Sequence, residues 1–316
     1  MDLLLFDLGG TNSRFVQTAP DAPLDAAQVT RLKNDDHASF AEILRAYFDQ
    51  SGAPAPRRVV IALAAPIAAG DRVRLTNRDW CIDKAEIARI SGADRVDFIN
   101  DFEALGHALQ DPDQLDHTPL TAARTAQARA PRLVLGAGTG FNSALWLPGD
   151  QVLRCEAGHA GYAAESDFER ALAERIRAEH GRCSVERVLS GGGIEAAYRC
   201  AASLADESPH LQGSREIVAA GLSGEDEVAA RACRAFTCAL GRVAGDLALL
   251  FLPRGGIYLF GGATQAMRPL ITAQDSLFLE AFHAKGRMRD LMEDFPIHLL
   301  DDDRAALQGA LNWARL

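Results

Sequence analysis

One pattern occurs twice in this chain, and it constrains the fold more than any other feature. Each copy is an apolar run of strand length, a turn that contains glycine and threonine, and a second apolar run. The first copy spans residues 3–16 and the second spans residues 132–146. Such an internal echo predicts two domains built on one plan, each presenting a Gly-Thr hairpin. Two unrelated hairpins are the alternative, because only a handful of residues match.

The first turn has the sequence Asp7-x-Gly9-Gly10-Thr11-Asn12. Glycines have no Cβ and accept positive φ, so backbone N–H groups can close around an anion, while Thr11 and Asn12 add side-chain donors. Asp7, at the end of the first strand, is placed to hold Mg²⁺ through water. An ordinary Gly-Gly hairpin turn with an exposed aspartate is the alternative.

The second turn reads Gly136-Ala137-Gly138-Thr139-Gly140. If the two Gly-Thr turns face each other, they can hold a polyphosphate between them. The polar, proline-containing stretch 110–130 precedes this second copy and is the best candidate for a domain boundary.

Composition excludes several classes of protein. The chain has 316 residues, 48% of them hydrophobic, which is enough for a substantial core and for two domains. Its formal charge of -10 comes without any basic block, which argues against nucleic acid or an anionic membrane as a partner. The most apolar helical stretch, 228–252, carries arginine and aspartate and therefore predicts a buried core helix, not a membrane span.

The cysteines indicate a reducing compartment. None of them forms a C-x-x-C pair, which fits reduced thiols in a cytoplasm better than a disulfide framework or a zinc site. Asp2 and Asp7 stand where a signal peptide would have a basic region, so we expect no export by that route. The six cysteines are Cys81, Cys155, Cys183, Cys200, Cys233 and Cys238.

Asn100 and Asp101 are the pair that we expect to serve catalysis. A predicted strand, 96–99, leads directly into them, and a helical stretch follows, which is where open α/β sheets place ligands. Phosphoryl transfer to an alcohol needs a carboxylate within hydrogen-bond reach of the hydroxyl. Capping of the next helix is the alternative role for such a residue.

Two further motifs carry polar side chains with more than one interpretation. Glu156-x-x-His159 matches half of a helical metal site, but Gly158 argues against a helix there, and a loop that exchanges hydrogen bonds with a polyol suits the residues better. A surface loop without function is the remaining alternative. Glu186 begins a helix, where the helix dipole favours a carboxylate with or without a ligand.

Gly261 and Gly262 follow a predicted strand, 256–260, and precede a helix. Two glycines at this junction allow the close approach of an adenine or a ribose. Glycine at strand-to-helix junctions is also common for packing alone, so this motif is weak when taken singly.

The order of these motifs is more specific than any one of them. Together with Leu75-Thr76-Asn77-x-x-Trp80, they occur in the order and spacing of the bacterial ATP-dependent glucokinases. The chain resembles this family over nearly its whole length. The resemblance implies an actin-like ATPase (hexokinase-type, ribonuclease H-like) fold, with mixed sheets flanked by helices and two α/β domains around a cleft. It implies a small domain of residues 1–110 plus 302–316 and a large domain of residues 111–301.

The resemblance also implies a role for each motif. The Thr11 and Thr139 hairpins become the two phosphate loops for ATP, accompanied by Mg²⁺, and the Gly261 junction becomes part of the adenosine site. Asp101 becomes the general base towards the 6-hydroxyl of glucose. The implied sugar contacts are Asn100, Glu156, His159 and Glu186. A zinc site is not expected, because the cysteine-rich cluster of the zinc-containing ROK sugar kinases is missing from this sequence.

The chain departs from the family at several positions close to these motifs. Phe141 and Asn142 stand where the family usually has Leu-Gly, and Arg154 and Cys155 stand where Pro-Gly is usual. Gly192 replaces a customary proline, and the stretch 303–309 differs from a usual Asn-Pro-containing segment. These changes leave the expected catalytic residues in place but affect the expectation of sugar selectivity and turnover.

The sequence therefore predicts a cytoplasmic glucokinase that transfers the γ-phosphate of ATP to glucose. A kinase for another hexose or an amino sugar is one alternative, and a non-catalytic sugar-sensing protein is another. A symmetric homodimer is the default expectation for its assembly.

Overall fold

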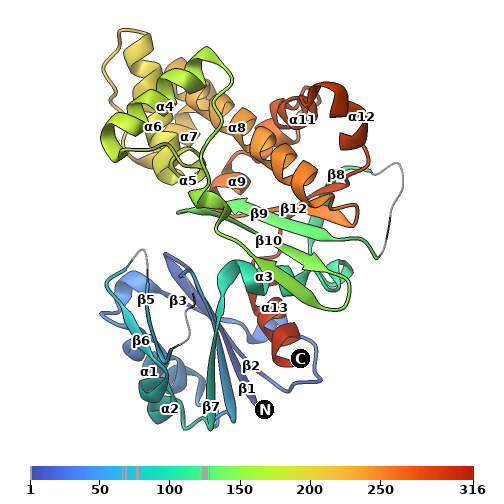
Figure 1. Cartoon of the computed structure of the whole chain (residues 1–316). Coiled ribbons are helices and arrows are strands. Elements are labelled where there is room, and N and C mark those ends of the chain that lie inside the picture. Colours follow the sequence, from blue (N-terminus) through green and yellow to red (C-terminus); the bar gives the residue numbers. More distant parts are fainter. Residues whose placement is uncertain (1, 66, 68–69, 76–77, 123–126, 128) are drawn as a thin grey trace. The chain divides into compact units, whose positions relative to one another are not determined.

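The computed structural model describes the chain except for residues 1, 66, 68–69, 76–77, 123–126 and 128. The chain divides into two units (Figure 1). Unit 1 contains Met1–Asp116, Gly149–Leu153 and Asp302–Leu316, and unit 2 contains His117–Pro148 and Arg154–Asp301.

Unit 1 is built on a sheet with the strand order β3-β2-β1-β4-β7. The predicted hairpin is confirmed, because β1 pairs antiparallel with β2, while β1, β4 and β7 run parallel. Both faces of β1 are buried, since Leu4 and Phe6 pack with helices α1 (Phe40–Ser51) and α2 (Lys84–Ser91), and Leu3 and Leu5 pack with helix α13 (Ala305–Ala314). The strands are β1 (Leu3–Leu8), β2 (Asn12–Thr18), β3 (Thr30–Lys33), β4 (Arg58–Leu63) and β7 (Arg95–Asn100); β5 (Arg72–Arg74) and β6 (Cys81–Asp83) form a separate pair.

Unit 2 repeats this plan, as the internal echo predicts. Its strands belong to a sheet with the order β11-β10-β9-β12-β13-β8, in which β9 and β10 form the antiparallel hairpin and β12 and β13 continue parallel to β9. The edge strand β11 falls mostly in the segment Gly149–Leu153, which is grouped with unit 1. The added edge strand β8 falls in the stretch 110–130, which the sequence marked as polar and as a candidate domain boundary but not as a strand. The strands are β8 (His117–Thr121), β9 (Arg132–Ala137), β10 (Phe141–Leu147), β11 (Gln151–Arg154), β12 (Gly256–Phe260) and β13 (Ile297–Leu300).

A helical layer covers one face of the second sheet (Figure 1). Its longest member, α8, is the buried helix predicted over 228–252, and its small residues admit a neighbour. A Cβ at Gly241 would lie 2.2 Å from the carbonyl oxygen of Phe278 in α11, so only glycine permits this contact. The helices of unit 2 are α4 (Asp167–His180), α5 (Val185–Val188), α6 (Gly191–Leu204), α7 (Gly213–Ser223), α8 (Glu227–Phe251), α9 (Gly262–Ala266), α10 (Arg268–Ile271), α11 (Leu277–His283) and α12 (Arg289–Met292).

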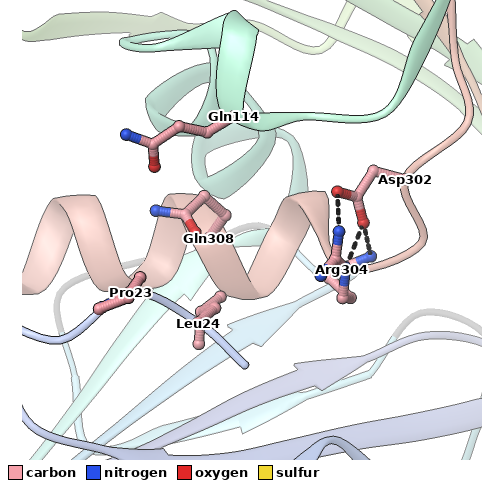
Figure 2. Close-up of a pocket in the computed structure, with 6 residues that line it drawn as sticks. All are labelled: Pro23, Leu24, Gln114, Asp302, Arg304 and Gln308. Atoms are coloured by element: carbon pink, nitrogen blue, oxygen red, sulfur yellow. Dashed lines mark hydrogen bonds and ion pairs between the residues drawn. The ribbon is translucent and has the colours of Figure 1, made fainter. Parts of the chain in front are cut away.

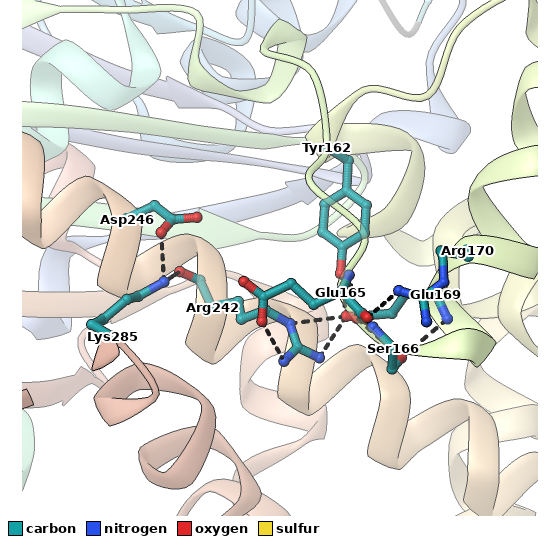
Figure 3. A network of polar contacts seen from close by, with 8 residues as sticks. All are labelled: Tyr162, Glu165, Ser166, Glu169, Arg170, Arg242, Asp246 and Lys285. Carbon is teal, nitrogen blue, oxygen red and sulfur yellow. Dashed lines mark hydrogen bonds and ion pairs between the residues drawn. The ribbon is translucent and has the colours of Figure 1, made fainter. Parts of the chain in front are cut away.

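A buried polar network fastens this layer (Figure 3). The Arg242 guanidinium in α8 lies 2.7 Å from the Glu169 carboxylate in α4, which also accepts a hydrogen bond from the Tyr162 hydroxyl. Burial opposes ionisation of Glu169, but hydrogen bonds from Ser166, Tyr162 and Arg242 outweigh it and hold the pKa of this carboxyl below its usual value. Lys285, after α11, donates to Asp246 and to the carbonyl oxygen of Arg242.

In unit 1, the C-terminal helix α13 packs on α3 and on the sheet. The contact is close at Gly309, where a Cβ would lie 1.6 Å from the carbonyl oxygen of Ala104. Further along the same pair, the Asn312 side chain donates to the carbonyl oxygen of His107 at 3.0 Å. The helices of unit 1 are α1 (Phe40–Ser51), α2 (Lys84–Ser91), α3 (Asp101–Ala108) and α13 (Ala305–Ala314).

We predict that Gly309→Ala lowers the free energy of unfolding by about 2 kcal/mol, because forced displacement of a packed backbone costs more than the roughly 1 kcal/mol that alanine gains in helix propensity. Urea unfolding measures the change. Gly192→Ala in α6 is the matched control, because its Cβ would come no closer than 3.8 Å to Ser190 Oγ. Equal effects of the two substitutions would contradict the steric argument.

His107 makes the stability of the protein depend on pH. Burial lowers its pKa to about 4, and its Nδ1 has no hydrogen-bond partner among the described residues. Between pH 4 and 6.5, His107 therefore binds a proton in the unfolded chain but not in the folded chain. The free energy of unfolding falls as the pH falls through this range. We predict that His107→Phe removes about 3 kcal/mol of this acid destabilisation. Urea unfolding of the parent and the variant at neutral pH and near pH 4 tests this, and the same pH dependence in both proteins would contradict it.

Candidate active site

The turn between β1 and β2 offers backbone donors. The amide of Gly9 is used within the turn, donating to the carbonyl oxygen of Asn12 at 3.2 Å. The amides of Gly10 and Thr11 donate to no acceptor among the described residues, and Thr11 and Asn12 are exposed. The backbone of Gly9 does not adopt positive φ. Glycine instead leaves room for the close approach of Asn12, because a Cβ would lie 3.2 Å from the Asn12 carbonyl oxygen. Unpaired amides beside exposed side-chain donors suit an anion.

Two residues that the sequence did not signal hold this turn in place. The buried Asn34 donates from its side chain to the carbonyl oxygen of Gly9 at 2.8 Å, accepts from the Ser13 hydroxyl at 2.6 Å, and donates its own amide to the carbonyl oxygen of Thr11. The Arg78 guanidinium donates to the carbonyl oxygen of Gly10 at 2.9 Å. Both contacts join segments far apart in the chain, and no local pattern predicts them.

Asp7 is buried at the end of β1 and forms an ion pair with Arg14 of β2 at 3.0 Å. Burial raises the pKa of its carboxyl, and the nearby Arg14 opposes that rise only in part. A second charged group, the Asp303 carboxylate, also raises the pKa of Asp7. Asp303 forms an ion pair with Arg14 as well, at a distance of 3.4 Å. A buried carboxylate that is costly to ionise gains from a nearby cation, so this position fits Mg²⁺ held through water.

Asn100 and Asp101 lie where β7 ends and α3 begins. Asn100 is the residue that caps the helix, because its Oδ1 accepts from the amides of Phe102 and Glu103 and its Nδ2 donates to the carbonyl oxygen of Ala65. Asp101 is the first helical residue, and its Oδ1 accepts from the Phe102 amide at 2.9 Å. The capping interpretation therefore holds for Asn100, which fixes the position of Asp101.

Strand register places these two parts of unit 1 at one edge of the sheet. Leu8, the last residue of β1, pairs with Leu63 of β4, and Leu63 pairs with Asn100 of β7. The glycine turn and Asp101 both follow directly on these strand ends. The carboxyl ends of parallel strands are where α/β sheets bind ligands.

The turn between β9 and β10 repeats this arrangement in unit 2. The Gly138 amide donates to the carbonyl oxygen of Gly140 at 2.8 Å, and the Gly138 carbonyl accepts from the amide of Gly191 at the start of α6. The amides of Thr139 and Gly140 have no acceptor among the residues that the structure describes. The side chain of Thr139 is exposed.

Glu186, in α5, is joined to this turn. Its Oε2 accepts from the backbone amide of Phe141 at 3.0 Å. A Cβ at Gly140 would lie 2.4 Å from the same oxygen, so glycine leaves the space that the carboxylate occupies. Its Oε1 has no partner among the described residues and is available to a ligand.

The loop that carries Glu156 and His159 packs against the same place. Gly158 leaves room for the carbonyl oxygen of Phe141, which would be 2.1 Å from a Cβ, and for the Cβ of Glu186 at 3.3 Å. Residues Ala157–His159 form a single 3-10 turn instead of an α-helix, which agrees with the glycine in it. Glu156 and His159 are exposed, and neither the carboxylate nor the imidazole is bonded to any described residue. The structure thus brings Glu156, His159 and Glu186 together.

The junction at Gly261 lies at the same edge of unit 2. Phe260, the last residue of β12, pairs with Gly136 of β9. Gly261 has φ 100° and lies so close to Ala137 that a Cβ would be 2.4 Å from that residue's carbonyl oxygen, which requires glycine on both counts. Gly262 has open space where its Cβ would be, which leaves room for a ligand at the start of α9.

A separate pocket of about 300 Å³ in unit 1 contains none of the expected site residues (Figure 2). Its strongest polar groups are already paired, because Arg304 donates to both oxygens of Asp302. The pocket is lined by Pro23, Leu24, Gln114, Asp302, Arg304 and Gln308.

Of the expected motifs, Thr76 and Asn77 lie outside the described residues.

A sequence model of the family described as Glucokinase matches residues 4–316. A glucokinase of Chromohalobacter salexigens is 36% identical over 313 residues, which cover 97% of this chain and 95% of the relative. The chain belongs to the glucokinase family. Glucokinases are ATP-dependent glucose phosphotransferases, so the expectation of an enzyme of this class is confirmed.

Comparison with solved structures confirms the actin-like ATPase fold that the repeated sheets form. The crystal structure of a glucokinase from an Antarctic psychrotroph has a TM-score of 0.80 at 30% identity and covers 98% of both chains. That of a ROK family glucokinase from Streptomyces griseus, in complex with glucose and AMPPNP, has a TM-score of 0.64 at 17% identity, with coverage of 99% for both chains.

Within the part of the chain that the structure describes, no cluster of three or more histidine, cysteine or acidic side chains is arranged to hold a metal ion. None of the described helices has both the length and the apolar character that crossing a membrane demands.

We predict that Gly140→Ala raises the KM for glucose about tenfold, because its methyl group displaces the Glu186 carboxylate and breaks the bond to Phe141. Steady-state kinetics with ATP and glucose measure the change. Gly161→Ala, in the next loop, meets no atom within 4 Å and is the matched control. An unchanged KM in the Gly140 variant would contradict a role for this clamp.

Proposed function

We propose that this chain transfers the γ-phosphate of ATP to the 6-hydroxyl of glucose, with Asp101 as general base. The observation that carries the proposal is the position of Asp101, which begins a helix at the same sheet edge as a glycine turn with unpaired amides. A base and a phosphate-binding turn at one edge are what a phosphoryl transfer to an alcohol requires.

In the proposed step, Asp101 accepts the proton of the glucose 6-hydroxyl. The resulting oxygen attacks the γ-phosphorus, the bond to the bridging oxygen breaks, and ADP leaves. The hydrogen bond from the Phe102 amide holds one oxygen of the Asp101 carboxylate in place at the start of α3. Asn100 contributes by holding the strand-to-helix junction, and its second amide proton is left for a sugar oxygen.

Glucose is held, in this proposal, by acceptor-rich side chains of unit 2 in addition to Asn100. Glu156 and His159 are exposed and uncommitted, and Glu186 keeps one carboxylate oxygen for a ligand. Carboxylates and a histidine accept hydrogen bonds from neutral sugar hydroxyls without needing charge on the ligand. The structure of the Streptomyces griseus neighbour in complex with glucose and AMPPNP supports glucose and ATP as the ligands.

The phosphates of ATP are assigned to the two glycine turns, and the adenosine to Gly261 and Gly262. Donors for the phosphates are the amides of Gly10 and Thr11 in one turn and of Thr139 and Gly140 in the other. Asp7 would hold Mg²⁺ through water, and the ion, when bound, neutralises phosphate charge. A single carboxylate suffices because Mg²⁺ in kinases takes its other ligands from phosphate and water.

Assembly and location follow as further parts of the proposal. We propose a homodimer, which is the commonest assembly of soluble proteins, and light scattering after size exclusion tests it. We propose a cytoplasmic location because the six cysteines are free thiols and because ATP is the phosphoryl donor.

Replacement of Asp101 by asparagine tests the mechanism. We expect Asp101→Asn to lower kcat by 10²- to 10⁴-fold while glucose binding, measured by calorimetry, changes little, because the amide keeps the shape but cannot accept the proton. Asp113→Asn, at an exposed position, is the control. A variant that turns over as fast as the parent chain would overturn the assignment of the base.

A sugar panel separates the alternatives. ADP release is followed with ATP and Mg²⁺ in the presence of glucose, mannose, fructose, N-acetylglucosamine or N-acetylmannosamine. A clear preference for glucose supports the proposal, and a preference for another sugar reassigns the substrate. No turnover of any sugar, together with binding of glucose, would favour a sensing role.

A further inference from the structure

At the start of β10, the side chains of Asn142 and Cys155 bond to the backbone of the strand. Strand β11, which pairs with β10, ends at Arg154, just before the loop that carries Glu156. At Ser143 the β10 backbone bonds to side chains: its amide donates to Asn142 Oδ1 at 2.9 Å, and its carbonyl accepts from Cys155 Sγ at 3.1 Å. The loop is thus anchored to the strand by Cys155 directly before Glu156.

Asn142 reaches the loop on the other side of Glu156. Its Oδ1 also accepts from the amide of Ala157 at 3.0 Å, so one oxygen binds the strand and the loop at once. Ala157 is the first residue of the short 3-10 turn, and its amide is one that the turn itself cannot satisfy.

This contact holds the backbone after Glu156, while Cys155 holds the backbone before it. Glu156 is the N-cap residue of the 3-10 turn, yet its side chain makes no capping bond. A capping side chain accepts from the second or third amide of a turn, whereas Asn142 accepts from the first, that of Ala157. The loop is thus held on both sides of Glu156 without use of its carboxylate, which is exposed.

Asn142 is one of the positions at which this chain departs from the glucokinase family. Where the family usually has glycine, no side chain exists to make either bond. The departure adds a link between β10, which follows the phosphate turn, and the loop that carries Glu156 and His159.

We propose that Asn142 is a positioning residue for the sugar, which holds the Glu156 loop in its binding conformation by satisfying the Ala157 amide. This inference rests on the proposed function, since it concerns the affinity and selectivity of the same site for glucose. Asn142 itself touches no reacting group in this assignment. Its effect on glucose passes through the position of Glu156.

The test compares Asn142→Ala with Asn142→Asp. Alanine removes the acceptor, whereas aspartate keeps an oxygen that both amides can use. We expect the alanine variant to raise the KM for glucose about tenfold, the equivalent of one hydrogen bond, with kcat and the KM for ATP within about twofold of the parent. The aspartate variant should recover most of the glucose affinity. Gln151→Ala, on the exposed part of β11, is the control that should change nothing.

Three outcomes overturn the inference. One is an unchanged KM for glucose in the alanine variant. Another is an equal loss in the alanine and aspartate variants. The third is a lowered melting temperature with no change in KM, which would assign Asn142 a purely structural role.

Calorimetric titration of glucose keeps this test separate from the proposed function. If the parent chain phosphorylates no sugar, the proposed function fails, yet the comparison of glucose affinity among the parent, alanine and aspartate forms still decides the role of Asn142. Should none of the three bind glucose, the inference fails together with the assignment of the sugar.

Discussion

The hydrogen bond between the Phe141 amide and the Glu186 carboxylate is the contact on which the arrangement of unit 2 depends. It ends the turn between β9 and β10, and it fixes one oxygen of a carboxylate whose other oxygen has no partner among the described residues. The carbonyl of Phe141 lies against Gly158, so one residue of β10 is in contact with both neighbours. Because Gly140 and Gly158 supply the necessary space, a side chain at either position would separate the turn, the helix and the loop. The glycines here serve close packing more than unusual backbone angles.

The repeated sheet allows residues at equivalent positions of the two units to be compared. In both units the fifth strand of the common order, β7 or β13, is followed directly by an aspartate, Asp101 or Asp301. Hydrogen bonds from Thr118 and Gln265 and an ion pair with Arg268 occupy Asp301 and, against the effect of burial, hold the pKa of its carboxyl below the usual value. In the function proposed above, the equivalent positions of the two units therefore have different roles. In unit 2, the strand β12 is followed by a different kind of residue. Gly261 and Gly262 come directly after it, and Gly262 leaves open space where a charged side chain could otherwise stand.

Many of the helices and strands can be predicted from the sequence, and those that cannot share a physical cause. The predicted strand 256–260 matches β12 to the residue, and the helix predicted over 228–252 differs from α8 by one residue at each end. These elements are apolar runs bounded by glycine, proline or charge, so local pattern decides them. The short strands β3 and β8 and the helices α9 to α12 were not delimited, because they are brief or polar and depend on partners distant in the chain. The same holds for Asn34 and Arg78, whose contacts with the first turn join remote segments.

Three of the positions at which the chain departs from the family pattern, Phe141, Asn142 and Cys155, lie close together in the structure. Phe141 is buried in the core of unit 2, while Asn142 and Cys155 both bond to the backbone of Ser143. These three positions therefore meet at the junction of β10 and the Glu156 loop, whereas Gly192 and the stretch 303–309 lie elsewhere. Asn142 Oδ1 accepts from the amides of both Ser143 and Ala157, and Cys155 donates to the Ser143 carbonyl, so two side chains join one residue of β10 to the chain on either side of Glu156.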